Sequence, residues 1–303
     1  MYLWRWLLLT LLALTLAGCD RPQQQVSRFN GTLERSFKDP KARQLGIAAE
    51  RGDAAEVRRL MKEEHVNPDV LFSDKNDGFP ILAWPILTQS PEGLRAMLEN
   101  GANPNAYQPY TNERGQVRRN DNAMVYAVQN EDPTYLKLLL EHGGDPSGRY
   151  SNGENLLYKA FIWHSQWQNI QLLIEHGANI NASTGDDGGQ TILFDYARYA
   201  DFDKVYWLLE RGATPTVTVQ FKNPPPNPPD PPRVLYSAVE NIYWYPVDYK
   251  EGEENWQRKC QIWLMQHGYP RPPMPKYHRE VREKFGYPTD EKDIPLPEPR
   301  NGS

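Results

Sequence analysis

Three histidines occupy the same place in a repeating pattern, which makes them the first residues to test for metal chemistry. His142, His176 and His267 each directly precede a glycine. Equivalent positions in stacked helical repeats lie about 10 Å apart, whereas a zinc ion needs its nitrogen ligands at about 2.0–2.1 Å. The spacing therefore argues against a metal ladder. It favours instead an interaction of each ring with the C-terminal end of a helix.

Other reactive side chains lack the neighbours that catalysis or metal binding requires. Asp186 and Asp187 lie in a loop, but the alternating acids and closing glutamate of an EF-hand are absent, so a hairpin tip is favoured. Cys260 has no recognisable histidine and asparagine arrangement. Three serines lack the Gly-x-Ser-x-Gly setting of a nucleophile: Ser165, Ser183 and Ser237. We therefore expect no catalytic residue, no metal and no cofactor, and keep a hydrolase that uses the loop acids as the alternative from the enzyme class.

Cys19 follows a segment that predicts covalent modification. An apolar run from Trp6 to Ala17 follows Arg5; it is shorter than the ~20 residues that span a bilayer and fits the hydrophobic region of a secretory signal. The run ends in Leu-Ala-Gly-Cys19, which resembles the lipobox of bacterial lipoproteins. The resemblance implies cleavage before Cys19, a diacylglycerol on its sulfur and an acylated new N-terminus. The alternatives are a general signal peptide with an incidental cysteine and an uncleaved anchor.

The resemblance divides the start of the chain and sets the compartment. It implies a lipoprotein signal peptide over 1–18 and periplasmic exposure of the mature protein, and polar residues without a period predict a flexible tether over 19–40. Asp20 resembles the inner-membrane retention signal of enteric bacteria. The formal charge of −5 becomes −6 without Arg5, which argues against nucleic acid or anionic lipid as a partner. With Cys19 lipidated, Cys260 is the only thiol left, so no internal disulfide can form.

The rest of the chain is dominated by a repeat. Five helix-like runs end in an apolar doublet, two polar residues and a glycine, at Gly101, Gly143, Gly177, Gly212 and Gly268. Earlier in each unit, and in a first unit with Leu60-Met61 as its doublet, an apolar residue is followed three positions later by a small or aromatic one: Leu45 and Ala48, Ile81 and Trp84, Met124 and Ala127, Leu157 and Ala160, Leu193 and Tyr196, and Leu235 and Ala238. This pattern predicts six pairs of helices that bury their apolar faces against neighbouring pairs.

These units resemble the ankyrin repeat, most clearly in Leu98-Glu-Asn-Gly-Ala-Asn-Pro-Asn105 and Ile174-Glu-His-Gly-Ala-Asn-Ile-Asn181. The resemblance implies an all-α ankyrin solenoid over 41–273, followed by a proline-rich tail over 274–303. The glycine supplies the left-handed cap of the second helix. No unit has the complete Thr-Pro-Leu-His helix start of the ankyrin consensus, so we expect irregular helix starts. A helical stretch over 277–285 is expected to cover the end of the stack.

Insertions supply the candidate binding residues. The insertion over 106–121 combines Tyr107, Tyr110, Arg114, Arg118 and Arg119, and we expect it to be a mobile loop that contacts an acidic surface of a partner. A second insertion, over 216–232, begins as an alternating segment and becomes proline-rich. A third candidate is the aromatic run Tyr243-Trp244-Tyr245, for which core and interface are equally favoured. Most other aromatic residues of the last three units, including Trp163 and Tyr199, are expected in the core.

The expected function is protein binding without catalysis, by a chain that is a monomer when unbound. The architecture resembles periplasmic immunity lipoproteins that neutralise type VI secretion effectors, especially membrane-acting lipases. The rival interpretation is a periplasmic scaffold for an envelope or stress-defence protein.

Overall fold

The computed structural model describes residues 32–73, 78–164, 166–183, 190–216, 218–220, 235–249 and 253–297. The expected signal peptide, Cys19 and most of the tether lie outside these residues, as do Asp186, Asp187, Ser165 and the proline run. Over the described part of the chain, no helix is both long enough and apolar enough to cross a membrane.

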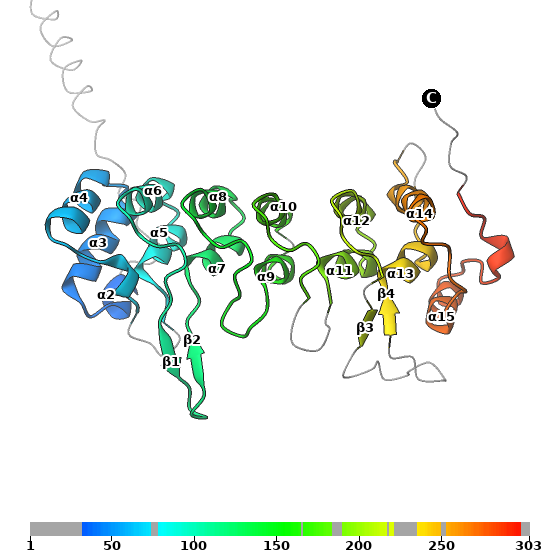
Figure 1. The fold of residues 1–303 in the computed structure, drawn as a ribbon, viewed down its shortest axis with the longest axis horizontal. Helices are drawn as coiled ribbons and strands as arrows, with labels where there is room; N and C mark the ends of the chain where they lie inside the picture. The colour runs from blue at the N-terminus through cyan, green and yellow to red at the C-terminus, as the bar shows by residue number, and fades with distance from the viewer. Residues whose placement is uncertain are drawn as a thin grey trace, which may run out of the picture.

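The helices form a two-layered stack of pairs that runs from left to right in Figure 1, which confirms the predicted ankyrin-like solenoid. The first helices of the six units form one layer: α3 (Pro40–Glu50), η3 (Ile81–Ala83) with α5 (Trp84–Leu87), α7 (Ala123–Val128), α9 (Leu156–Ile162), α11 (Ile192–Arg198) and α13 (Ala238–Trp244). The second helices form the other: α4 (Ala54–Arg58) with η1 (Arg59–Glu63), α6 (Pro91–Glu99), α8 (Thr134–Glu141), α10 (Trp167–Glu175), α12 (Phe202–Leu209) and α14 (Trp256–Gln266).

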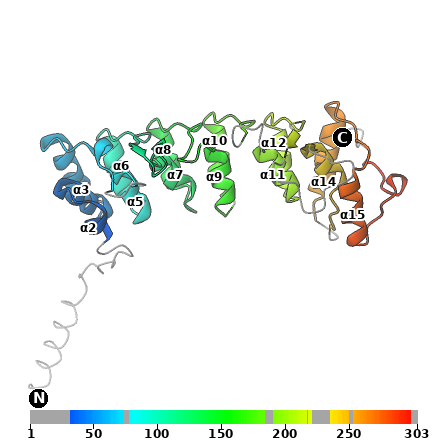
Figure 2. The same ribbon diagram turned by 90° about the horizontal axis from the view of Figure 1, so that it is seen from below.

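Additional elements lie at the two ends of the stack. Figure 2 shows an elongated body that runs from α2 (Thr32–Ser36) at one end to α15 (Lys276–Lys284) at the other. The expected helix over 277–285 is therefore present. Arg282 of α15 donates from Nη1 to the carbonyl of Trp244 at 3.1 Å and from Nε to the carbonyl of Pro288 at 2.6 Å. These bonds satisfy a carbonyl at the C-terminal end of α13 and hold α15 against the last unit. Two short 3₁₀ helices, η2 (Pro68–Val70) and η4 (Glu291–Asp293), complete the described helices.

Side-chain caps make most first helices start regularly, which corrects the expectation of irregular starts. In units three to six the residue before the helix accepts a hydrogen bond from the backbone N–H three positions later; these caps are Asn122, Asn155, Thr191 and Ser237. Asn, Thr and Ser are the residues that perform this role best. Unit two starts irregularly, as a 3₁₀ turn after Pro80 without a side-chain cap.

The glycine caps of the second helices are confirmed. Gly101, Gly143, Gly177, Gly212 and Gly268 have φ between +81° and +96°. The N–H after each cap bonds a carbonyl five residues back, as Ala178 does to Leu173 at 2.9 Å, the Schellman arrangement. In the first unit His65 occupies the left-handed position instead, at φ 57°. There Val66 reaches back six residues to Leu60, because the π-helical turn η1 absorbs one extra residue.

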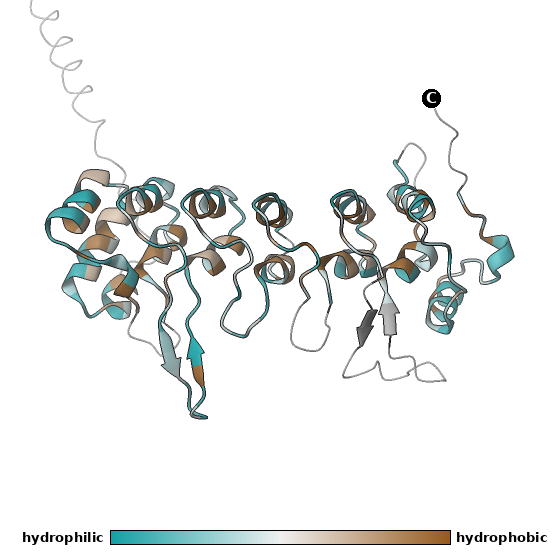
Figure 3. Ribbon diagram, in the orientation of Figure 1, coloured by the Kyte–Doolittle hydropathy of each residue, from teal (hydrophilic) through white to brown (hydrophobic). Residues whose placement is uncertain are grey.

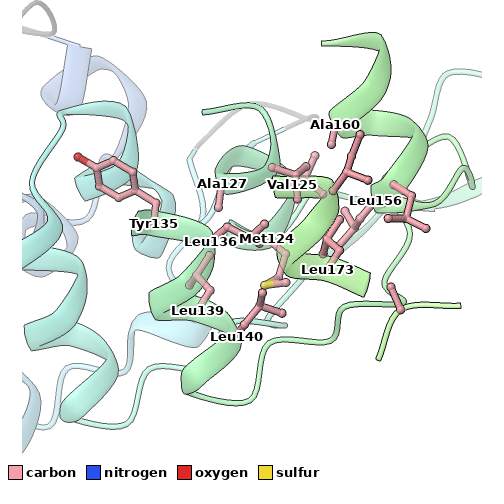
Figure 4. Close-up of a cluster of buried hydrophobic side chains, with 14 of the residues drawn as sticks. Met124, Val125, Ala127, Tyr135, Leu136, Leu139, Leu140, Leu156, Ala160 and Leu173 are labelled. Carbon is pink, nitrogen blue, oxygen red and sulfur yellow. The ribbon is translucent and has the colours of Figure 1, made fainter. Parts of the chain in front are cut away.

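The core lies between the two layers (Figure 3). Figure 4 shows Met124, Leu136, Leu139 and Leu173, from three helices of units three and four, gathered in one cluster; each is at most 1% exposed. Gly93 of α6 permits an especially close approach to α3, because a Cβ there would lie 1.8 Å from the carbonyl oxygen of Ala49.

In the sixth unit, the sequence interpretation assigned the wrong residues to the first helix. Leu235 belongs to strand β4 (Leu235–Ser237), which pairs antiparallel with β3 (Thr218–Gln220). The helix starts after Ser237, so Val239 and Ile242 occupy the places assigned to Leu235 and Ala238. Residues 218–220, within the alternating segment before the proline run, form β3. The pairing of β4 with β3 keeps Leu235 extended. No local sequence pattern revealed this pairing.

Candidate protein-binding surface

The insertion over 106–121 forms a β-hairpin rather than an irregular loop. Strand β1 (Pro109–Thr111) pairs antiparallel with β2 (Val117–Arg119), with Tyr110 opposite Arg118. At the tip, Oδ1 of Asn112 accepts hydrogen bonds from the backbone N–H groups of Arg114 and Gln116 at 3.0 and 2.9 Å. Figure 1 shows that this hairpin projects beyond the first-helix layer, on the same side as the β3–β4 pair.

The hairpin exposes three of the five predicted residues and leaves the other two half-buried, in a basic and aromatic patch. Arg114 and Arg118 are exposed and Tyr107 is 53% exposed, while Tyr110 and Arg119 are half-buried. The guanidinium of Arg119 lies 5.6 Å from the centre of the Tyr107 ring, a cation–π contact that holds both side chains in place. Val117, 75% exposed, adds apolar area between the arginines. We call these residues, Tyr107 to Arg119, the hairpin surface.

Arg149 is the residue of this region that the sequence interpretation missed. It lies on the loop after α8, forms a β-bridge with Asn155, and donates from Nη1 to the carbonyl of Gly153 at 2.6 Å. Nη2 of Arg119 donates to the carbonyl of Arg149 at 2.7 Å. This bond joins the hairpin to the following unit. The lone arginine in a glycine-rich turn carried no sequence signal of its own, because only the fold places it beside the hairpin.

The arginines of this region have no acidic partner within the described part of the chain. Arg114, Arg118, Arg119 and Arg149 make no ion pair with a carboxylate there, although nine such pairs are found elsewhere in it. Their only polar contacts are the two carbonyl bonds above and a contact of Arg118 with the amide oxygen of Gln116 at 3.2 Å. The hairpin carries three arginines and one acid, Glu113, so the surface is a local excess of positive charge on an acidic chain.

A cavity of about 270 Å³ lies where the hairpin meets the next loop. Its lining combines two arginines, a tyrosine ring and several amide side chains: Asn105, Tyr107, Arg119, Asn120, Asn122, Asp145, Gly148 and Arg149. Asn120 is 5% exposed, and its Oδ1 is buried without a hydrogen-bond partner. Such an atom is costly to leave unpaired.

The aromatic run of the sixth unit is not a surface, which corrects its assignment as a binding site. Tyr243 and Trp244 are 2% and 0% exposed. The hydroxyl of Tyr243 donates to the carbonyl of Tyr269 at 2.9 Å, and Nε1 of Trp244 donates to the carbonyl of Pro272 at 3.1 Å. Tyr245 is half-buried against the core. The chain after α14 folds back over α13 and covers these side chains, which reasoning from local periodicity could not anticipate.

Two aromatic residues expected in the core are exposed instead. Trp163 and Tyr199, 46% and 61% exposed, follow the ends of α9 and α11. They lie at the opposite ends of the first helices from the hairpins. The rings that do fill the space between units four and five are Phe161, Trp167, Tyr196 and Trp207, with ring centres 5.1 to 5.3 Å apart.

The three histidines confirm the structural interpretation. Nδ1 of His142, His176 and His267 lies 2.8 to 2.9 Å from the carbonyl oxygen four residues earlier. A carbonyl can only accept, so Nδ1 carries the proton in each ring. The rings satisfy carbonyls at the ends of second helices. Among the described residues, no group of three histidine, cysteine or acidic side chains could hold a metal ion.

Comparison with known proteins agrees with this architecture. The family described as ankyrin repeats (3 copies) matches residues 113–219. A fowlpox virus (strain NVSL) protein named for ankyrin repeats, FPV034, is 34% identical over 96 residues, which are 32% of this chain and only 22% of the viral protein. The crystal structure of the ankyrin repeat domain of Bcl-3, a member of the IkappaB family, superposes with a TM-score of 0.51 at 22% identity, over 75% of this chain and 86% of that one. These matches and the stacked, glycine-capped helix pairs show that residues 113–219 match the ankyrin-repeat family and that the described residues have the fold of an ankyrin-repeat domain.

Proposed function

We propose that the chain is a non-catalytic scaffold that binds a protein partner through its hairpin surface, together with Arg149. The elongated shape and projecting hairpins suit recognition of another macromolecule. The hydrolase alternative relies on Asp186 and Asp187, which lie outside the described residues.

One observation supports the proposal most strongly: arginines without an ion pair among the described residues lie beside exposed Tyr107 and Val117. Arginine forms forked, charge-assisted hydrogen bonds with carboxylates, and tyrosine with arginine is the composition of interface hot spots. An acidic patch on the partner is therefore the expected complement. Opposite charge would also accelerate the encounter of the two proteins.

We further propose that the scaffold is anchored by lipidated Cys19 to a bacterial membrane and faces the periplasm. The lipobox-like Leu-Ala-Gly-Cys19 supports the anchor, and Asp20 supports the inner membrane. A periplasmic binder of this design suits the neutralisation of a secreted toxic effector, such as a type VI lipase. The rival role is a scaffold for an envelope or stress-defence protein. A toxin gene adjacent to this one supports the first, and its absence supports the second.

The test is a charge reversal that leaves the fold intact. Arg114→Glu/Arg118→Glu changes two exposed side chains that make no backbone contact. The control Arg95→Glu/Arg258→Glu makes the same change of charge on exposed positions of α6 and α14. A partner recovered from envelope extract with the parent protein is then titrated against all three. We expect the hairpin variant to bind at least ~10-fold more weakly, from the loss of one or two charged hydrogen bonds, and the control to bind as the parent does. Equal loss in both variants, or in neither, rejects the hairpin surface as the interface.

A further inference from the structure

The cavity between the hairpin and the following loop has the features of a side-chain pocket within the hairpin surface. It lies between two units that are joined by the Arg119 to Arg149 bond. The ring of Tyr107 forms one wall. Its volume of about 270 Å³ is many times the ~10–15 Å³ that a cavity needs to hold one water, so it has room for a side chain.

The amide groups of the lining are largely committed to the fold. Oδ1 of Asn105 accepts from the N–H of Asp145 and its Nδ2 donates to the carbonyl of Gly143, both at 2.8 Å. Oδ1 of Asn122 caps α7 at the N–H of Val125. These side chains shape the pocket and have little capacity left to bind a ligand. Arg119 and Arg149 retain guanidinium N–H donors beyond those that they give to carbonyls.

The charge of the lining favours an anion. Arg119 and Arg149 each use one guanidinium nitrogen for a carbonyl, which fixes the plane of the group and leaves its remaining N–H donors available. Asp145 is the one acid in the lining, and its Oδ1 accepts from the N–H of Ser147 at 2.9 Å. The two positive charges therefore exceed the one negative charge.

Asn120 adds a second, independent requirement. Its buried Oδ1 lacks a hydrogen-bond donor. A ligand with an N–H group close to its anionic end would satisfy that oxygen after a rotation of the amide. A free anion such as acetate carries no such donor, whereas an acidic residue within a peptide carries its backbone N–H next to the carboxylate side chain.

We infer that this pocket receives an acidic side chain, aspartate or glutamate, from an extended segment of the protein partner. The carboxylate lies between the guanidinium groups of Arg119 and Arg149, the Tyr107 ring covers its methylene carbons, and Asn120 accepts a hydrogen bond from the peptide backbone. This inference rests on the proposed function and specifies what the hairpin surface recognises.

The experiment uses short blocked peptides as probes, so it does not require the partner. Acetyl-Gly-Glu-Gly-amide, acetyl-Gly-Gln-Gly-amide and sodium acetate are titrated into the ¹⁵N-labelled mature protein, and the backbone amide shifts are followed. We expect saturable shifts confined to residues 105–122 and 145–149 with the Glu peptide. The Gln peptide and acetate should bind about 10-fold more weakly, because the Gln peptide lacks the carboxylate and acetate lacks the backbone N–H.

Variants separate binding from folding. Arg119→Gln/Arg149→Gln should abolish the shifts, and Arg119→Lys/Arg149→Lys should restore part of them by restoring charge. Arg95→Gln, an exposed change on α6 outside the hairpin surface, should leave them unchanged. Melting curves establish that each variant folds. If Arg119→Gln/Arg149→Gln does not fold, Asn120→Asp, which places a negative charge in the lining of the pocket, should abolish the shifts instead. Shifts of equal size with Glu and Gln peptides, shifts elsewhere, or no shifts reject the pocket.

The partner distinguishes the two proposals. Loss of partner binding in Arg114→Glu/Arg118→Glu but not in Arg119→Gln/Arg149→Gln rejects the pocket and keeps the hairpin surface. Loss in neither pair rejects both.

Discussion

The Oδ1 atom of Asn105 accepts a 2.8 Å hydrogen bond from the backbone N–H of Asp145, one repeat further along the chain. The same bond joins Asp69 to Asn103 at 2.8 Å and Asn181 to Thr214 at 2.7 Å. Each acceptor is four residues after the left-handed cap of one unit, and each donor is two residues after the cap of the next. The terminal Asn or Asp of the repeat pattern is thus a staple between units.

The staple is missing at two of the five steps. At the last step the donor position holds Pro270, which has no N–H, and the other step gives a prediction about stability. Ser147 occupies the acceptor position before Asn179, and no hydrogen bond joins the two in the described structure. Ser147→Asn supplies the longer side chain and should stabilise the stack by about 0.5–1.5 kcal/mol, the usual net value of one hydrogen bond. Asn181→Ala should destabilise it by about the same amount or more, since it leaves the N–H of Thr214 without its acceptor. Urea denaturation measures both.

Ser147→Ala is the control for this pair, because Ser147 is exposed and its side chain makes no bond between units. It should leave the midpoint unchanged. A midpoint for Ser147→Asn equal to that of Ser147→Ala would mean that the loops are too far apart for the staple to form.

A second prediction concerns the glycine cap of α10. Gly177 has φ 95°, and an added Cβ would meet nothing within 4 Å. Any cost of substitution is therefore conformational and not steric crowding by neighbours. Gly177→Val should destabilise the protein by about 1–2 kcal/mol or more, because a β-branched residue is a poor fit to the left-handed region. Nearest-neighbour coupling should extend the loss of hydrogen-exchange protection into the adjacent units.

His65 provides the reciprocal change at the equivalent cap of the first unit. His65→Gly removes the left-handed strain of a non-glycine residue and should leave stability equal or raise it by up to about 1 kcal/mol. If Gly177→Val melts at the temperature of the parent protein, the cap assignment is wrong.

A third prediction tests the anchor. Cys19→Ser should prevent acylation and release the protein from membranes, because stable anchoring requires more than one lipid chain and the lipobox cysteine would carry them. Fractionation of cells with detection of the protein in membrane and soluble fractions is the measurement. Cys260→Ser is the matched control, since that thiol is buried and should not affect location. Membrane retention of Cys19→Ser with unchanged electrophoretic mobility contradicts lipidation.

The repeat and its caps could be predicted from the sequence because they depend on local chemistry. Glycine after Leu173-Ile174 marks a left-handed cap wherever the helix lies, and the five glycines confirm it. The hairpin surface was predicted only as a composition: Tyr107 and Arg118 were identified, but the strand pairing that holds them was not. Short strands of three residues carry too little period to be recognised.

The residues that sequence reasoning misplaced depend on contacts distant in the chain. Tyr243 and Trp244 are buried because residues 269–272 return to cover them. Arg149 joins the site through the Arg119 bond, thirty residues away. Neither relationship leaves a mark within a helical window, so both required the folded structure.

The last prediction follows from Asp195, a carboxyl group within the stack. Asp195 is 2% exposed, and its Oδ2 has no hydrogen-bond partner. Burial raises the pKa of this group to about 7, although the charge of Arg198 opposes the shift. Tyr158 of α9 is the other titratable group that interacts with it, and its own pKa is raised by burial and by this carboxylate.

The sign of the effect on stability follows from the raised pKa of Asp195. Between the unfolded pKa of about 3.9 and the folded pKa of about 7 the folded state binds more protons than the unfolded state. The free energy of unfolding therefore falls as pH rises through this window, by up to about 4 kcal/mol if the full shift is realised, and becomes independent of this group above it. Asp195→Asn should remove the slope and should be more stable than the parent at pH 8. Glu175→Gln, an exposed change of the same kind on α10, should keep the slope. Urea denaturation at intervals from pH 4.5 to 8 measures it; parallel pH profiles for the parent and Asp195→Asn would show that Asp195 titrates with the same pKa in the folded and unfolded chain.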